Sequence, residues 1–366
     1  SVFMELSMNR LLKNDGLLGF ITPETFIRTS TYQDIRNFLI DCKLIKEVHI
    51  YGMGVFENVT AETVTLIIRN SFDEKNIVHF FKYNDLNNLL VFKEEQSSFK
   101  ASPQNRFLYG SNTGDKTIFE KMKSTSNYLL GEVVEVRNGI ATKSGKNSFI
   151  SEYKINEDYK KLLESPDLSR YGFVWPNKFI NYNPVLLHRP RKEDTFTSKK
   201  ILLQRVSSRL ICSYDDESFY TFNSVNNLIQ KNENISLIYV LGVLNSKLMD
   251  FYYRKNYSLD AGFTITVTKA NLDSLPIVFK DDFQNKFEDW VKCMTSDNKT
   301  RNDLNIKFQN YLKQKFQLEK LSKKLQNWHE LEFGDFIKEL NKAIKLSNKQ
   351  RLKDNLQEVP TLTKKD

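Results

Sequence analysis

The fold of the first part of the chain is decided by Leu17-Leu18-Gly19-Phe20-Ile21-Thr22-Pro23. This short, continuous apolar run ends at a proline, a pattern typical of a strand that is buried on both faces. We expect an amphipathic helix at residues 32–39 and further strands at 44–50 and 60–68. Alternating strands and helices favour a mostly parallel sheet covered on both faces. Three strands do not complete such a sheet, so we expect its opening half upstream or on another chain.

The composition is that of a globular, basic protein. The chain has 366 residues, of which 40% are hydrophobic and 13% aromatic, so a wholly disordered chain is excluded. We find no apolar run near the roughly 20 residues of a membrane span and no secretory leader, so no membrane association is expected. The three cysteines are far apart and the four histidines scattered, which fits neither a disulfide frame nor a metal site. A reducing cytoplasm is the simplest expectation.

The positive charge is concentrated in the middle and last parts of the chain. The net charge is +9 in total, made up of −2 for residues 1–100, +7 for 101–280 and +4 for 281–366. This distribution favours a polyanion partner for the two later parts. The alternative is that a lysine- and asparagine-rich proteome yields basic proteins without any role in nucleic-acid binding.

The sequence pattern divides the chain into three regions. Residues 1–95 carry the strands and helix described above, and the polar stretch at 93–103 is expected to be a linker. Residues 101–280 show short β-rich runs between polar turns, followed by a helix at 237–249. From residue 281 to 366 the pattern is helical and charged, with apolar residues at i, i+4 and i+8, first at Phe308, Leu312 and Phe316 and again at Phe336, Leu340 and Ile344.

The segments together resemble the TaqI type of N6-adenine DNA methyltransferases, which include the fused type IIG restriction-modification enzymes and related phage-defence methylases. The first region resembles strands that follow the catalytic motif, the middle region a target-recognition domain, and the last region the helical tail of long members. The stretches that carry the resemblance are residues 16–23, 32–36, 54–56, 63–68, 138–145, 200–205, 244–248, 268–277 and 328–336. The implied fold is an α/β remnant of a Rossmann-like methyltransferase sheet, an α+β target-recognition (DNA specificity) domain, and a helical C-terminal tail.

The chain departs from the family at the two motifs that perform the chemistry. The family binds S-adenosylmethionine at a glycine-rich turn and acts at an Asn-Pro-Pro-Tyr-like motif, but no two of the eight prolines here are adjacent. Gly52-Met53-Gly54 runs toward an expected strand and has no third glycine, so we reject it as a cofactor turn. The resemblance implies S-adenosylmethionine as cofactor of the complete enzyme and none for this polypeptide, which should be inactive alone. Its partner would be an upstream methyltransferase portion, in the same or a separate chain; a type IIG parent would also have a nuclease domain upstream.

Phe56 is the candidate for stacking on the target base. A base buried in a duplex must be flipped out before its exocyclic nitrogen can react, and the resemblance places a stacking aromatic at this position. Such stacking contributes about 1–3 kcal/mol per base. The alternative is an ordinary core residue, because the chain has 27 phenylalanines.

The candidate DNA-binding residues fall on three polar segments. A glycine-flanked loop is basic and hydroxyl-rich, with Gly139 and Gly145 allowing close approach to nucleic acid, although a solvated hairpin turn is the alternative. A second turn carries arginines that can fork onto guanine and a glutamine that can read adenine, with a salt bridge to Asp215 or Asp216 as the competing use of either arginine. A third cluster is polar and aromatic. The candidates are Lys143, Ser144, Lys146 and Asn147 in the first, Gln204, Arg205, Ser207 and Arg209 in the second, and Lys178 and Asn181 in the third.

The sequence therefore predicts recognition of double-stranded DNA for N6-adenine methylation in a restriction-modification or phage-defence system. The alternative is a non-catalytic DNA specificity subunit that works with a separate methyltransferase or nuclease chain.

Overall fold

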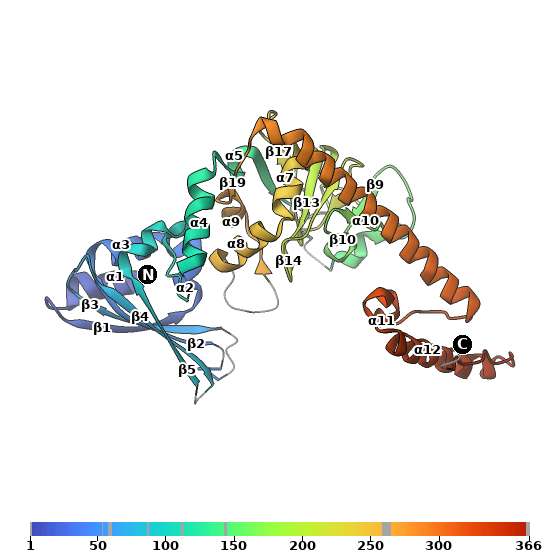
Figure 1. Cartoon of the computed structure of the whole chain (residues 1–366), viewed down its shortest axis with the longest axis horizontal. Coiled ribbons are helices and arrows are strands. Elements are labelled where there is room, and N and C mark those ends of the chain that lie inside the picture. The colour runs from blue at the N-terminus through green and yellow to red at the C-terminus, as the bar shows by residue number, and fades with distance from the viewer. Residues whose placement is uncertain are drawn as a thin grey trace. The chain divides into compact units, whose positions relative to one another are not determined.

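The computed structural model forms two compact units, Ser1–Tyr171 with Trp175–Val291, and Gly172–Val174 with Lys292–Asp366 (Figure 1). Within the described ranges, no helix combines the length and apolar character that a membrane crossing demands. The structure describes residues 2–52, 54–57, 61–85, 88–110, 113–142, 145–257 and 265–363.

The first unit begins with a five-stranded sheet in the order β1-β3-β2-β4-β5. Its strands are β1 (Leu17–Pro23), β2 (Leu44–Gly52), β3 (Thr63–Arg69), β4 (Ile77–Asp85) and β5 (Asn88–Glu95). Only the β2–β4 pairing in this sheet is parallel, while β1–β3, β2–β3 and β4–β5 are antiparallel. The predicted mostly parallel sheet of three strands is therefore wrong. A continuous apolar run marks a strand but carries no information about the direction of its neighbour. The prediction that residues 17–23 are buried on both faces is also wrong, because β1 is an edge strand whose side chains are alternately exposed and half-buried.

Helices cover one face of this sheet (Figure 1). They are α1 (Val2–Leu6), the π-helix Ser7–Leu11, α2 (Thr25–Arg28), a 3-10 turn at Ser30–Tyr32 and α3 (Gln33–Cys42). Leu39 of α3 and Val48, Leu66 and Phe80 of the strands are fully buried in the shared core. The other face is not covered by helices in the described part of the chain, so the prediction of two covered faces is also wrong here.

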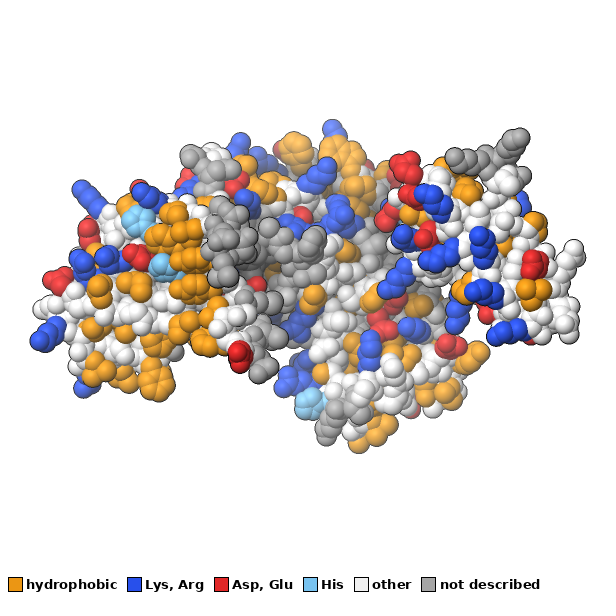
Figure 2. All heavy atoms as spheres, turned by 90° about the horizontal axis from the view of Figure 1, so that it is seen from below, with side chains coloured by type: hydrophobic (Ala, Val, Ile, Leu, Met, Phe, Trp, Pro, Cys, Tyr) orange, Lys and Arg blue, Asp and Glu red, His pale blue; other side chains and the backbone are white. Residues whose placement is uncertain are grey.

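The uncovered face carries a ladder of stacked rings. His49 on β2 lies opposite Phe81 on β4, with ring centroids 4.7 Å apart, and Tyr51 stacks on Tyr83 at 5.1 Å. All four side chains are partly exposed. Figure 2 shows hydrophobic side chains gathered beside histidines over this sheet.

The predicted linker at residues 93–103 is part of the packed structure. β5 continues to Glu95 and is followed by 3-10 helices at Gln96–Ala101 and Pro103–Asn105. The buried Gln96 amide donates to the Lys43 carbonyl at 2.7 Å and accepts from the Ile45 amide at 2.9 Å. These bonds satisfy the backbone where α3 turns into β2, so this polar side chain holds the segment in place.

Two four-stranded sheets form the centre of residues 113–280. One, in the order β15-β13-β17-β7, contains β7 (Val134–Asn138), β13 (Lys200–Gln204), β15 (Cys212–Asp215) and β17 (Val225–Gln230). The other, in the order β16-β9-β12-β8, contains β8 (Ile150–Ser151), β9 (Tyr159–Leu163), β12 (Phe179–Asn181) and β16 (Tyr220–Thr221). The remaining strands pair in twos: β6 (Tyr128–Leu129) with β19 (Pro276–Ile277), β10 (Leu168–Ser169) with β11 (Gly172–Phe173), and β14 (Val206–Ser207) with β18 (Ile265–Thr266).

Helices pack against the first of these sheets. They include α7 (Leu237–Leu244) and α8 (Lys247–Tyr257), whose Leu241 and Tyr253 lie in the same core as Leu203 and Leu228. The single helix predicted at 237–249 is thus two. It breaks at the buried Asn245, whose side chain accepts from the Cys212 amide at 3.1 Å and donates to the Cys212 carbonyl at 2.9 Å. The other helices of this region are α4 (Thr113–Thr125), α5 (Leu130–Val133), α6 (Asp194–Thr197) and α9 (Lys269–Asp273), with 3-10 turns at Lys146–Phe149 and Ser165–Asp167.

The second unit is helical, as its sequence pattern predicts. α10 (Asp281–Lys315) begins in the first unit, and α11 (Lys323–Gln326), a 3-10 turn (Trp328–Glu330) and α12 (Phe333–Lys353) follow. The predicted apolar repeats form its core, in which Leu312, Phe316, Leu340 and Ile344 are buried.

Candidate nucleic-acid interface

Three segments that are far apart in sequence meet at one end of the strands in residues 113–280. The backbones of Ala141 and Arg189 exchange two hydrogen bonds, of 3.2 and 3.0 Å. The Asn223 amide donates to the Ile140 carbonyl at 2.9 Å. Arg205 donates from its backbone amide to the Ser224 carbonyl at 2.9 Å. The loop after β7, the loop near residue 189 and the turn after β13 are therefore joined by main-chain contacts.

Gly139 is required by packing within the protein rather than by approach to a ligand. A Cβ atom at this position would lie 2.2 Å from the carbonyl oxygen of Phe222 and 2.5 Å from that of Thr221. The hypothesis that Gly139 allows nucleic acid to approach is replaced by this close contact between chain segments. At Gly145, by contrast, a Cβ would meet no atom within 4 Å, so the surface there is open.

Glu164 brings two of the predicted DNA-binding lysines together. Its carboxylate accepts from the ammonium of Lys146 on one oxygen and lies 3.2 Å from the ammonium of Lys178 on the other. Burial of Glu164 disfavours its charged form, but bonds and charge from the two lysines outweigh burial and hold the pKa of Glu164 below its usual value. Each lysine is thus partly neutralised, although the three groups together keep one positive charge. Asn147 is exposed next to Lys146, and Lys143 and Ser144 lie outside the described residues.

The side chain of Gln204 has a structural role. Its side chain is buried, and its amide donates to the carbonyls of Ser165 at 2.6 Å and Leu168 at 3.0 Å. These bonds fix the 3-10 turn that follows Glu164. Because both amide hydrogens are occupied inside the protein, Gln204 cannot donate to an adenine without breaking them.

Ser207 and Asn181 are also turned partly inward. The Ser207 hydroxyl is buried and donates to the carbonyl of Arg209. Asn181 on β12 is half-buried, and its side-chain oxygen accepts no hydrogen bond among the described residues. The Asn181 oxygen is itself buried, so a base edge does not reach it in this arrangement, and the hydroxyl of Ser207 is engaged in shaping its turn.

Arg205 and Arg209 point away from the protein core. Arg209 is exposed and Arg205 is half-exposed, with one guanidinium contact to the Asn223 carbonyl at 3.4 Å. Among the described residues, neither arginine forms an ion pair, and Asp215, considered above as a competing partner, is paired with Lys200. Both guanidinium groups remain available to an external anion or base edge.

The sequence reasoning missed two arginines beside this turn. Arg189 is exposed, and Arg191 donates from Nε to the Gly139 carbonyl at 3.0 Å. Burial, with the like charge of Arg189, lowers the pKa of Arg191 from its usual value. Two adjacent guanidinium groups repel each other until an anion lies between them. The basic run His188-Arg189-Pro190-Arg191-Lys192 was the signal that could have identified them.

Phe56 lies on the connection between β2 and β3, two strands of the five-stranded sheet. Its side chain is 48% exposed, which leaves the ring free to contact a partner. Gly52 and Gly54 have φ angles of 72° and 84°, values that strain other residues, and the connection leads into β3. The two glycines thus serve the turn after β2.

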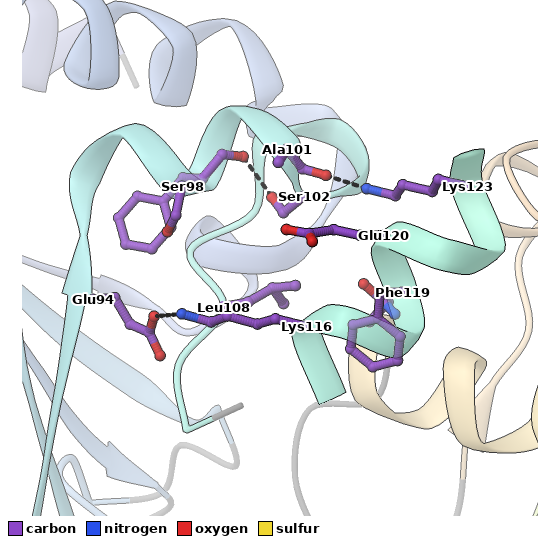
Figure 3. A pocket seen from close by; sticks show the side chains of 11 residues that line it. Glu94, Ser98, Ala101, Ser102, Leu108, Lys116, Phe119, Glu120 and Lys123 are labelled. Atoms are coloured by element: carbon purple, nitrogen blue, oxygen red, sulfur yellow. Dashed lines mark hydrogen bonds and ion pairs between the residues drawn. The ribbon is translucent and has the colours of Figure 1, made fainter. Parts of the chain in front are cut away.

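The pocket between the end of β5 and α4 is small, and its Lys116 is paired with a carboxylate of the protein. Its volume is about 120 Å³, below the roughly 300–1,000 Å³ of typical small-molecule pockets. Figure 3 shows Lys116 reaching Glu94, a 2.6 Å ion pair, and Lys123 reaching the Ala101 carbonyl. A cofactor the size of S-adenosylmethionine does not fit there. Among the described residues, no group of three His, Cys, Asp or Glu side chains can hold a metal.

Comparison with known families agrees with the resemblance seen in the sequence. Residues 160–277 match the TaqI-like C-terminal specificity domain, and residues 1–56 match the Eco57I restriction-modification methylase. Residues 280–365 match a domain of unknown function, DUF8810.

Two relatives cover much of the chain. A putative type II restriction enzyme and methyltransferase of Methanocaldococcus jannaschii, RM.MjaORFECS2P, is 25% identical over 323 residues, 82% of this chain and 26% of that protein. The type II restriction enzyme and methyltransferase RM.Eco57I of Escherichia coli is 28% identical over 210 residues, 50% of this chain and 21% of that protein. The chain thus spans about a quarter of the length of these relatives.

A solved structure has a similar fold. The type IIL restriction-modification enzyme MmeI in complex with DNA has a TM-score of 0.51 and 10% sequence identity, over 82% of this chain and 44% of that chain. The family matches and the relatives lead to one conclusion: the chain is homologous to type II restriction-modification enzymes and carries a TaqI-like C-terminal specificity domain.

Proposed function

We propose that residues 101–280 read a double-stranded DNA sequence so that an adenine within it is methylated at N6. The observation that carries this proposal is that Arg189 and Arg191 on one loop and Arg205 on another turn lie on segments that main-chain hydrogen bonds join through residues 140–141 and 223–224. Arginine on a rigid main-chain support is suited to bidentate contact with guanine in the major groove and to phosphate contact. Lys146, Lys178 and Asn147 would flank these contacts along the backbone.

In this proposal the residues divide between base reading and positioning. Arg205 and Arg209 are the candidates for base edges because the first is half-exposed, the second is exposed, and neither forms an ion pair among the described residues. Gln204 and Ser207 position the turn, since their polar groups are bonded within the protein. Asn181 makes no base contact in this arrangement, because its side-chain oxygen is buried.

Catalysis would require an upstream methyltransferase portion, on the same or a separate chain, that binds S-adenosylmethionine. This polypeptide has no adjacent prolines and so no Asn-Pro-Pro-Tyr motif. β1 lies at one edge of its sheet, with Leu17 and Ile21 exposed, and the ring ladder on β2 and β4 is uncovered. These surfaces are where the missing strands and helices would pack, and Phe56 would then stack on the flipped adenine.

Binding of duplex DNA by the purified chain is the first test. Duplexes enriched from a random pool should bind far more tightly than scrambled ones, and the affinity should fall steeply with salt. Arg205→Ala should relax preference at one base pair, whereas an equal loss on all sequences would make Arg205 a phosphate contact. Absence of binding at low salt would contradict the proposal.

A methyl-transfer assay separates the split enzyme from a non-catalytic specificity subunit. The chain alone should transfer no methyl group to duplex DNA, and adding the complementary methyltransferase polypeptide should produce activity. Selective DNA binding without activity in the mixture would instead favour the specificity subunit.

A further inference from the structure

α12 carries a row of lysines along one face. Five exposed lysines recur at intervals of four, three, four and four residues, which keeps them within one narrow stripe of a 3.6-residue helix. At 1.5 Å per residue the row is about 22 Å long. The lysine row consists of Lys338, Lys342, Lys345, Lys349 and Lys353.

The packing of α12 turns this row outward. Leu340 and Ile344, on the opposite face, are buried in the core of the second unit. Asn341 and Asn348 fix the rotation of the helix, donating at 2.8 Å to the carbonyls of Leu362 and Val359. The row is therefore presented by a rigid support.

Most of the positive charge of the row is not neutralised within the protein. Lys338 pairs with Asp335 at 2.9 Å, and the neighbouring Glu339 is paired with Lys324 at 3.6 Å. In the part of the chain that the structure describes, no carboxylate pairs with Lys342, Lys345, Lys349 or Lys353. Figure 2 shows lysine and arginine side chains gathered over this part of the molecule.

The surface along the row is hollowed. Two depressions, of about 670 and 600 Å³, share Lys342, Leu346 and Lys349 in their walls. The larger also contains Lys320 and Lys353, with Glu319 and Glu339 as its acidic members. Cationic depressions along a lysine row about 22 Å long suit an extended anion better than a compact one.

We propose that the lysine row holds the phosphodiester backbone of double-stranded DNA without regard to sequence. Duplex DNA carries a phosphate on each strand every ~3.4 Å of helix axis, so a row of about 22 Å can face several phosphates of the duplex. Lysine provides a mobile point charge without the fork geometry of arginine, which suits phosphate contact rather than base reading. This inference rests on DNA binding by the chain as proposed above, and gives the helical unit a separate role in it.

An anionic membrane is the less suitable partner. A helix that lies on a bilayer inserts a continuous apolar face, but the apolar face of α12 is buried in its own unit. The exposed Leu346 and Leu352 fall on either side of the lysine row and form no common stripe.

The test compares two triple variants of the full chain on duplex DNA of unrelated sequence. The first is Lys342→Gln, Lys345→Gln and Lys349→Gln, and the control is Lys299→Gln, Arg301→Gln and Lys307→Gln on exposed positions of α10. Both lose three charges, and glutamine is a good helix former, so the fold should persist. Fluorescence anisotropy at about 50–200 mM salt gives the slope of log K against log[salt].

The α12 variant should lower the slope magnitude by up to about 2.7, at roughly 0.9 per lost phosphate contact, and weaken binding at least about tenfold on every sequence. The control should keep the wild-type slope. An unchanged slope in the α12 variant, with normal DNA binding by wild type, would overturn this inference and leave sequence reading by residues 101–280 intact.

Two further outcomes are distinguishable. Wild type that binds all duplexes equally, with a slope still reduced by the α12 variant, would contradict the proposed sequence reading and support the lysine row. Loss of binding to anionic lipid vesicles in the α12 variant, with DNA binding unchanged, would overturn the DNA assignment in favour of a membrane.

Discussion

The carboxylate of Glu164 lies 3.2 Å from the ammonium of Lys178, and its other oxygen accepts from Lys146. One buried acid thus holds two basic segments that are 32 positions apart in sequence. Because the two lysines keep the pKa of Glu164 below its usual value of 4.5, its ionised form is favoured by folding.

The stability contributed by Glu164 should therefore be complete above pH 4.5 and decline as pH falls through its lower folded-state pKa. Glu164→Gln should lower the melting temperature at pH 7 and reduce the loss of stability between neutral pH and pH 4. Thermal unfolding of both proteins across this range measures the difference. Parallel curves would mean that the carboxylate is not coupled to the lysines.

Lys200 and Asp215 form a fully buried ion pair, with the ammonium 2.5 Å from the carboxylate. Burial lowers the pKa of Lys200 and raises that of Asp215, while each charge favours the ionised form of the other. Lys200→Met leaves a buried carboxylate unpaired and should cost about 3–5 kcal/mol in the free energy of unfolding. The double variant Lys200→Met/Asp215→Leu should lose less free energy of unfolding in denaturant than Lys200→Met alone. An equal or greater loss in the double variant would contradict this account.

Gln204 and Arg205 are neighbours with opposite expected behaviour. Gln204→Leu removes hydrogen bonds to the part-buried Ser165 carbonyl and the buried Leu168 carbonyl and should destabilise the protein by about 1–3 kcal/mol. Arg205→Ala should change stability by less than about 0.5 kcal/mol, as surface substitutions usually do, yet weaken DNA binding. Paired unfolding and anisotropy measurements test both, and normal stability in Gln204→Leu would show that its hydrogen bonds are dispensable.

Gly139 and Gly145 provide a second matched comparison. An alanine at 139 places Cβ 2.2 Å from the Phe222 carbonyl oxygen, so Gly139→Ala should destabilise by at least about 1–3 kcal/mol, as overpacking does. Gly145→Ala meets no neighbouring atom and should be nearly neutral. If urea midpoints of the two variants agree, the close contact at Gly139 does not exist in solution.

The periodicity of apolar residues predicts the positions of helices and strands and the helix faces that are buried, because these depend on neighbouring residues in the sequence. The repeats at Phe308, Leu312 and Phe316 identified core residues of the second unit because a 3.6-residue period selects one helix face. The strand at 17–23 was also found, but strand direction in the first sheet was not. Direction depends on which neighbour a strand meets, and apolar runs do not contain that information.

The candidate site was predictable at the level of segments but less so at the level of residues. Lys146, Lys178 and Gln204 lie where three loops and turns form the candidate interface, yet each is bonded within the protein. Glu164, which links the two lysines, looks like any surface acid in the sequence. Its role arises from burial and from contacts across 14 and 18 positions, which spacing cannot reveal.

The central claim is sequence reading by residues 101–280, and competition binding tests it most directly. A labelled duplex selected from a random pool is bound by the full chain at about 0.15 M salt, near physiological ionic strength, and challenged with scrambled duplex. We expect the selected site to bind at least about 10³-fold more tightly, with the preference reduced by Arg205→Ala at one base pair. Equal competition by the scrambled duplex would contradict the account.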